Sequence, residues 1–176
     1  LGAEVTILEL SQRRLAELDD LFGGRAQTLV SNEANLTHAL ADADLVIGAV
    51  LITGARAPKL IRREHVERML PGSVIVDVAI DQGGCVETIR PTSHDEPTFT
   101  LHDVLHYAVP NMPAAVARTS TLALTSTTLP YGLLIAERGY EAASRLKPEL
   151  AHGLNVAAGR VAHPVVANAL SLLRAA

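Results

Sequence analysis

The first half of the chain alternates between short apolar runs and segments whose apolar residues recur every three or four positions. The short runs predict β-strands and the spaced segments predict helices, because these two periodicities each place apolar side chains on one face. Strands alternating with helices on short connections predict parallel pairing through right-handed crossovers, with helices on both faces of the sheet. In chain order, the predicted elements are strand 4–8, helix 12–21, strand 26–30, helix 33–41, strand 45–48, helix 62–70 and strand 74–80.

Cap and turn residues indicate where several of these elements begin and end. Ser11 can accept a backbone N–H at the start of the first helix, and Ser31 or Asn32 can do so for the second. Gly23-Gly24 ends the first helix, and Pro71-Gly72 opens the last strand. These signals agree with the periodicity on the order of the elements.

The pattern changes beyond position 81. Residues 82–100 are polar and predict a loop, and short strands are expected at 101–102 and 106–109, with a turn between them. Pro130 is expected to open an apolar helix that continues to Arg138 and ends at Gly139. Further helices are predicted at 140–150 and 165–174.

Asp81 directly follows the most apolar run of the chain. Residues 74–80 are rich in Val and Ile, which is typical of a strand buried on both faces of a parallel sheet. Gly83-Gly84 then forms a turn that would let a ligand approach. Because ligands bind at the carboxyl ends of the strands in such sheets, Asp81 is either part of a binding site or a cap for the turn.

Composition excludes several other classes of protein. The chain has 176 residues, is 48% hydrophobic and carries a net charge of −4, which describes a globular protein with a sizeable core. The absence of a basic stripe and the 3% aromatic content argue against a nucleic-acid partner, and no apolar run is long enough for a membrane span. The seven histidines lack metal-ligand spacing, so no metal site is predicted. The one cysteine, Cys85, fits a reducing, cytoplasmic compartment.

Glu9 ends the first predicted strand. A dinucleotide-binding fold places an acidic residue at the end of its second strand, where it binds the adenosine ribose hydroxyls. The glycine-rich phosphate turn should lie about 20 residues earlier, which here falls before residue 1. The sequence therefore predicts a Rossmann-type parallel sheet with helices on both faces and its first strand missing, followed by C-terminal helices. A solvated strand-end side chain is the other interpretation of Glu9.

Other candidate residues each allow two interpretations. The segment 48–51 offers small residues beside a cofactor, or forms an ordinary turn. Asn111, which follows Pro110, either fixes a substrate or nicotinamide group or simply forms a turn. Arg14 and Arg90 could contact phosphate or adenine, although most arginines are solvated surface residues.

Six segments are longer and more specific. They are 45–51 (LVIGAVL), 55–60 (ARAPKL), 76–85 (VDVAIDQGGC), 90–92 (RPT), 111–113 (NMP) and 119–125 (TSTLALT). Together they resemble the alanine dehydrogenase family, and the resemblance covers almost the whole chain, weakening after about residue 150. The NAD-binding subunit of transhydrogenase shares parts of the same pattern.

The resemblance implies an enzyme that catalyses reversible, NAD-dependent oxidative deamination of L-alanine to pyruvate and ammonia. It also implies a cytoplasmic homo-oligomer, usually a hexamer, and it assigns the role of the catalytic aspartate to Asp81. The cofactor-binding residues that it implies are Glu9, Arg14, Ser31, Val50, Leu51, Val78, Ala79, Ile80, Asp81, Arg90, Val109, Pro110, Asn111 and Met112.

The sequence departs from the family pattern in three ways. The amino-terminal substrate domain, with its catalytic His, and the glycine loop are not found, and Pro110 stands where the family usually has Ala. Because Pro lacks an N–H, a backbone hydrogen bond to nicotinamide would be lost there. The predicted organisation is an incomplete NAD-binding domain over 1–118 and a helical segment over 119–176 that returns to the substrate domain. A non-catalytic nucleotide-binding fragment and a transhydrogenase subunit remain the alternatives.

Overall fold

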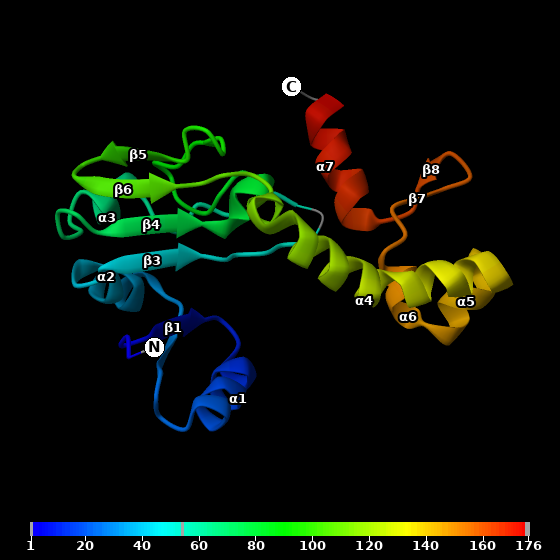
Figure 1. Cartoon of the computed structure of the whole chain (residues 1–176), viewed down its shortest axis with the longest axis horizontal. Helices are drawn as coiled ribbons and strands as arrows, with labels where there is room; N and C mark the ends of the chain where they lie inside the picture. The colour runs from blue at the N-terminus through cyan, green and yellow to red at the C-terminus, as the bar shows by residue number, and fades with distance from the viewer. Residues whose placement is uncertain (1, 54, 175–176) are drawn as a thin grey trace.

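The first part of the chain folds as alternating strands and helices, as predicted (Figure 1). The computed structural model describes residues 2–53 and 55–174. Ser11 and Asn32 cap the first two helices, accepting the backbone N–H groups of Arg14 and Asn35. The elements are β1 (Thr6–Glu9), α1 (Gln12–Phe22), β2 (Gln27–Val30), α2 (Glu33–Ala41), β3 (Leu45–Gly48), α3 (Arg63–Val66) and β4 (Val74–Asp77).

Most of the strands up to residue 107 pair in parallel, but they form two sheets rather than one. β1 pairs with β2, and a separate sheet has the order β3-β4-β6-β5, in which only β5 (Thr98–Leu101) runs antiparallel to β6 (Val104–Tyr107). Among the described residues, β1 and β3 each keep one edge without a neighbouring strand. Apolar side chains stay exposed on β3, with Leu45 at 55% and Ile47 at 62%. The predicted parallel α/β fold is therefore confirmed, with an interruption between β1 and β3.

The core lies between the larger sheet and the helices α2 and α3. Val66 of α3, Ile75 of β4 and Val104 of β6 are fully buried and belong to one hydrophobic cluster. Burial of each such side chain stabilises the fold by about 1.5–3 kcal/mol. Because β4 is paired on both edges, the residues that follow it are placed at the centre of the sheet.

Several predicted boundaries in this region are wrong. β4 ends at Asp77 rather than at residue 80, and Val78–Gln82 forms a short 3₁₀ helix, η1. α3 is shorter than the predicted helix 62–70. The strands expected at 101–102 and 106–109 are displaced, because the tight turn between β5 and β6 lies at His102-Asp103, where both residues have positive φ.

The C-terminal part is helical and extends away from the sheets (Figure 1). Pro130 was expected to open a helix, but it lies inside one, because the preceding Ser- and Thr-rich segment is itself helical. The predicted stop at Gly139 is confirmed. The elements are η2 (Met112–Val116), α4 (Ala117–Arg138), α5 (Tyr140–Leu146), α6 (Pro148–His152), β7 (Val156–Ala157), β8 (Arg160–Val161) and α7 (Pro164–Arg174).

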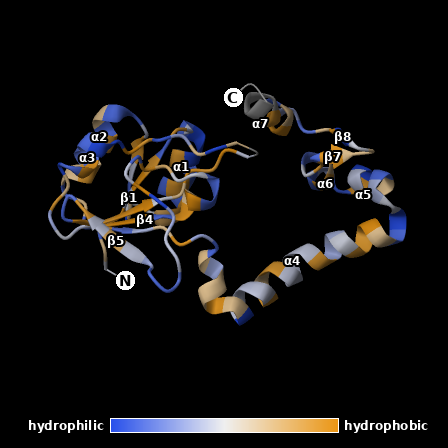
Figure 2. Cartoon of the chain, turned by 90° about the horizontal axis from the view of Figure 1, so that it is seen from above, coloured by the Kyte–Doolittle hydropathy of each residue, from blue (hydrophilic) through white to orange (hydrophobic). Residues whose placement is uncertain are grey.

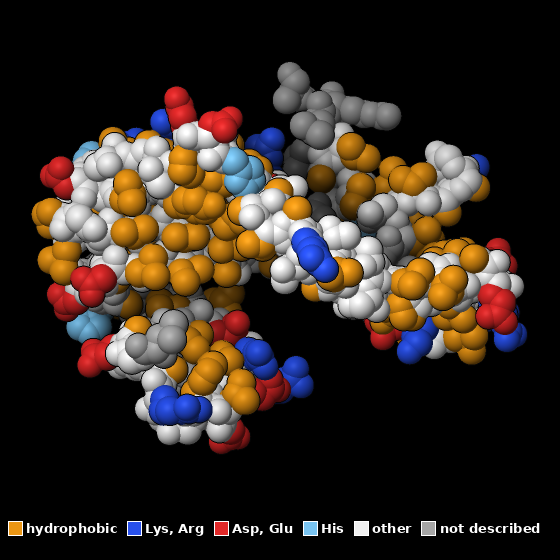
Figure 3. All heavy atoms as spheres, viewed as in Figure 1, with side chains coloured by type: hydrophobic (Ala, Val, Ile, Leu, Met, Phe, Trp, Pro, Cys, Tyr) orange, Lys and Arg blue, Asp and Glu red, His pale blue; other side chains and the backbone are white. Residues whose placement is uncertain are grey.

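Helix α4 carries apolar residues that the described chain leaves uncovered. Figure 2 shows polar and apolar residues mixed along the helix, and Figure 3 shows apolar side chains along its surface. None of its residues is buried, and Leu122, Leu124 and Leu133 are each about 60% exposed. Despite its length, α4 is not apolar enough for a membrane span, and no other described helix meets that requirement.

Candidate functional site

Asp77, the last residue of β4, is a buried polar group at the carboxyl end of the central strand. Its side chain is fully buried, with 0% exposure. Oδ1 accepts the N–H of Ala79 at 3.0 Å, and Oδ2 accepts the N–H groups of Cys85 and Val86 at 2.8 and 3.2 Å. A buried carboxylate is stable only with such partners. Asp77 therefore fixes the loop 78–86 to the end of the central strand.

Two glycines make this arrangement sterically possible. A Cβ on Gly84, whose φ is +73°, would lie 2.7 Å from Asp77 Oδ2. A Cβ on Gly48, at the end of β3, would lie 2.5 Å from Cys85 Sγ. Both contacts are shorter than van der Waals separation. The small residue that ends β3 is thus required for packing against loop 78–86.

Asp81 lies on η1, four residues beyond Asp77 at the end of β4, and not directly at a strand end as predicted. Its side chain is exposed and makes no hydrogen bond or ion pair within the described part of the chain. The capping role considered for Asp81 belongs instead to Asp77, which accepts the N–H of Ala79 at the start of η1. Asp81 therefore presents an unpaired carboxylate near the carboxyl edge of the sheet.

The remaining predicted residues of this edge differ in accessibility. Leu51 and Val78 are exposed, at 69% and 48%, so their side chains can contact a ligand. Val109 is buried, as are Ala79 and Ile80 at 8% and 5% exposure, so these residues present little surface to a ligand. The partly buried Val50 packs against the hydrophobic cluster.

The segment after β6 turns sharply at Asn111. This residue adopts a left-handed conformation with φ of 53°, and its carbonyl accepts the N–H of Ala114 at 2.9 Å. Asn tolerates this conformation better than most residues, so the turn-forming interpretation accounts for its presence here. Pro110 and Met112 are partly exposed on either side of it.

Glu9 and Ser31 come together at the carboxyl ends of β1 and β2. Glu9 pairs with Val30 in the register, and the Ser31 N–H donates to the Glu9 carbonyl at 2.9 Å. The Glu9 carboxylate also accepts the N–H of Ser11 at 2.9 Å, so it is neither fully solvated nor free. Arg14 points elsewhere, because its guanidinium pairs with Glu17 at 3.0 Å.

Arg90 belongs to a stack of side chains that no pattern in the sequence predicts. Its guanidinium carbon lies 4.3 Å from the centre of the Phe99 ring, which stacks on the buried His106 at 4.8 Å. His106 bonds Thr88 through Nε2 at 2.8 Å and the Val104 carbonyl through Nδ1 at 2.9 Å. Burial lowers the pKa of His106, which favours the neutral imidazole in this stack.

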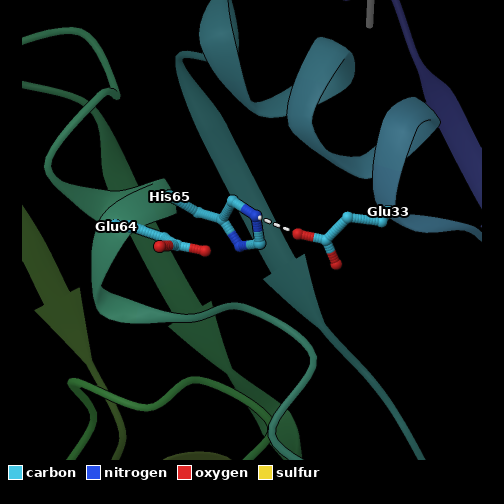
Figure 4. Close-up of side chains that lie close together, drawn as sticks. All are labelled: Glu33, Glu64 and His65. Atoms are coloured by element: carbon cyan, nitrogen blue, oxygen red, sulfur yellow. Dashed lines mark hydrogen bonds and ion pairs between the residues drawn. The ribbon is translucent and has the colours of Figure 1, made fainter.

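Three possible metal ligands also approach one another, although the sequence predicted no metal site. Single ligand atoms of Glu33, Glu64 and His65 all lie within 4.8 Å of one another (Figure 4). However, the Arg62 side chain donates to both carboxylates at 3.3 Å, and the Arg62 N–H donates to His65 Nδ1 at 3.1 Å. His65 Nε2 then donates to Glu33 at 3.0 Å. The cluster is thus an ion-pair network that joins α2 to α3.

Cys85 is expected to be unreactive in the folded protein. Burial, followed by the nearby Asp77 charge, raises the pKa of its thiol from 9.0 to about 11. Since only the thiolate is nucleophilic, alkylation at pH of about 8 should be at least about 100-fold slower than in urea-unfolded protein. Measuring iodoacetamide incorporation by mass spectrometry tests this expectation.

The raised pKa of the Cys85 thiol also predicts that the fold becomes less stable at alkaline pH. The raised pKa stabilises the fold fully below a pH of about 9, and this contribution is lost as the pH rises towards about 11. Equal alkylation rates for the folded and unfolded protein would contradict the buried position of Cys85.

The parallel strands, with their crossover helices and a ligand-accessible carboxyl edge, define a Rossmann-type α/β protein. The chain belongs to the family described as "Alanine dehydrogenase/PNT, C-terminal domain", which matches residues 1–164. The resemblance inferred from the sequence segments is thereby confirmed.

Individual relatives agree with this assignment. The chain is 57% identical over 173 residues to an alanine dehydrogenase of Methanococcus maripaludis and 54% identical to one of Staphylococcus haemolyticus, covering 98% of this chain and 46% of each relative. A solved L-alanine dehydrogenase structure is 51% identical, with a TM-score of 0.81 over 98% of this chain and 47% of that one. A transhydrogenase structure from Sinorhizobium meliloti shares the fold. It is 24% identical, with a TM-score of 0.65 over 93% of this chain and 43% of that one. The chain spans about half the length of the curated relatives it matches.

Proposed function

We propose that this chain is the NAD-binding part of an NAD-dependent alanine dehydrogenase, which converts L-alanine and water reversibly to pyruvate and ammonia. The observation that carries the proposal is the identity of 51–57% to alanine dehydrogenases along almost the whole chain. The transhydrogenase alternative has less support, since the likeness to the transhydrogenase structure, at 24% identity, extends to the fold alone.

The residues at the carboxyl edge fit a dinucleotide. The partly buried Glu9 would accept hydrogen bonds from the adenosine ribose, since a carboxylate at a strand end suits its hydroxyls. The exposed Leu51 and Val78 would cover the apolar faces of the cofactor, and Arg90 would present a charge oriented by Phe99. NAD held there would supply the acceptor for the hydride that leaves the substrate carbon.

Asp81 is the residue of this chain that we assign to the chemical step. Its exposed, unpaired carboxylate lies on η1, directly after the central strand. In this role it would orient the attacking water or stabilise the positive charge that develops on the substrate. Val78, Ala79 and Ile80 precede it and would run beside the nicotinamide end, with Val78 the most exposed of the three.

In the proposed domain organisation, residues 1–118 form a nucleotide-binding domain, and residues 119–176 form a helical segment that returns to the substrate domain. The support for this organisation is the uncovered α4, whose exposed leucines need a partner surface. The unpaired edges of β1 and β3 support a further strand between them. We also propose that the whole protein is a cytoplasmic homo-oligomer, a hexamer as in the family.

Calorimetry with NADH, combined with a circular dichroism melt, tests cofactor binding by this chain. We expect saturable binding and a cooperative melt, with Glu9→Gln weakening binding about tenfold because a charge-assisted hydrogen bond becomes a neutral one. Gln keeps an oxygen for the Ser11 N–H, so its effect on folding should be small. Glu4→Gln, an exposed change ahead of the same strand, serves as the control.

The negative outcomes separate two explanations. A cooperative melt without NADH binding would contradict the proposed cofactor role. Absence of both would show that the isolated chain is an incomplete piece and that NAD binding belongs to a longer protein.

A further inference from the structure

Loop 78–86, which carries Asp81, is held from two sides. Asp77 binds it from the buried side, as described above. From the exposed side, Lys59 Nζ donates hydrogen bonds to the carbonyl oxygens of Gly83 and Val86, at 2.6 and 3.0 Å. These two carbonyls flank Gly84, where the chain reverses with a positive φ.

The backbone around Lys59 follows the same loop. The Ala57 N–H donates to the Gln82 carbonyl at 2.9 Å, and the N–H groups of Leu60 and Ile61 donate to the Cys85 carbonyl at 2.9 and 3.1 Å. Segment 57–61 therefore lies alongside segment 82–86. The Lys59 ammonium lies against the turn between Gly83 and Val86, both of whose carbonyls it binds. Charge-assisted bonds of this kind are stronger than the neutral bonds beside them.

We propose that Lys59 is a positioning residue for Asp81. The Asp81 side chain has no partner of its own among the described residues, so its place is set by the backbone of η1 and of the turn that follows. That turn closes through the N–H of Gly83 on the Ile80 carbonyl and the N–H of Gly84 on the Ala79 carbonyl. Lys59 holds the other end of the turn. This inference rests on the proposed function, because it assumes that Asp81 acts in turnover.

A role in positioning differs from direct ligand binding in what it changes. Two of the three ammonium protons are used by backbone carbonyls, so Lys59 acts on the loop. Its loss should therefore lower kcat, through misplacement of Asp81, more than it weakens NADH binding. Loss of a direct ligand contact would instead weaken NADH binding more than it lowers kcat.

The test compares Lys59→Met, Lys59→Arg and Lys147→Met in the complete protein. For Lys59→Met we expect kcat to fall about tenfold, with KM for NAD changing less than about twofold, because small displacements of a reacting group are costly. Lys59→Arg should restore most of kcat. Lys147 is the other lysine of the chain, and its side chain makes none of the hydrogen bonds or ion pairs found in the described residues, so Lys147→Met should match the wild type.

Amide hydrogen exchange supplies a readout that does not depend on activity. In Lys59→Met the amides of Gly83, Gly84 and Cys85 should exchange about tenfold faster, since the loop opens more often. Unchanged exchange with kcat within about twofold of the wild type would overturn the inference. So would a large loss of NADH affinity with unchanged kcat, which would make Lys59 a ligand contact. A wild-type protein without alanine-dependent NAD reduction would overturn the proposed function, and with it the role in turnover, while exchange would still show whether Lys59 holds the loop.

Discussion

Replacing Asp77 with alanine is expected to lower the free energy of unfolding by at least about 3 kcal/mol. The reason is that three buried N–H groups, those of Ala79, Cys85 and Val86, would lose their acceptor, and each unsatisfied donor costs about 1–3 kcal/mol. Urea unfolding followed by circular dichroism measures the change. Asp77→Asn should cost less, since the amide keeps one oxygen acceptor.

Asp81→Ala is the matched control for this experiment. It removes a carboxylate four positions further along the chain, but from an exposed side chain without a partner among the described residues. Its effect on stability should stay within about 0.5 kcal/mol. Equal losses for the two variants would contradict the anchoring role of Asp77.

The second large effect is a loss of turnover when the Asp81 carboxylate is removed. Asp81→Asn in the complete protein should reduce alanine-dependent NAD reduction by about 10²–10⁴-fold, because the amide cannot exchange a proton or carry the negative charge proposed for this site. The unfolding midpoint should stay close to that of the wild type, since the side chain is exposed. Steady-state assays that follow NADH absorbance give kcat and KM for each variant.

Asp95→Asn is a suitable control, because Asp95 is also exposed, in the loop before β5. Its turnover should match that of the wild type. Turnover of Asp81→Asn within about tenfold of the wild type would remove Asp81 from the mechanism. The stability of loop 78–86 and the chemistry of Asp81 are thus tested by separate measurements.

The sequence by itself determined the order of strands and helices through residue 77. Periodicity and cap residues are local signals, and Ser11 and Gly139 act in the structure as their positions predicted. The family also followed from the sequence, because its segments are long and contiguous. These features depend on neighbours in the chain, which is why they could be predicted.

The tertiary structure alone decided which of two nearby carboxylates anchors the loop. Asp77 and Asp81 both follow apolar residues, and the sequence does not show which of them accepts the N–H groups of the loop. The difference arises because the N–H groups of Cys85 and Val86 fold back onto Asp77 and end β4 there. Similarly, the stack of Arg90 on Phe99 and His106 joins residues separated along the chain. Such contacts depend on how distant segments pack in three dimensions, so they cannot be predicted from the local sequence pattern.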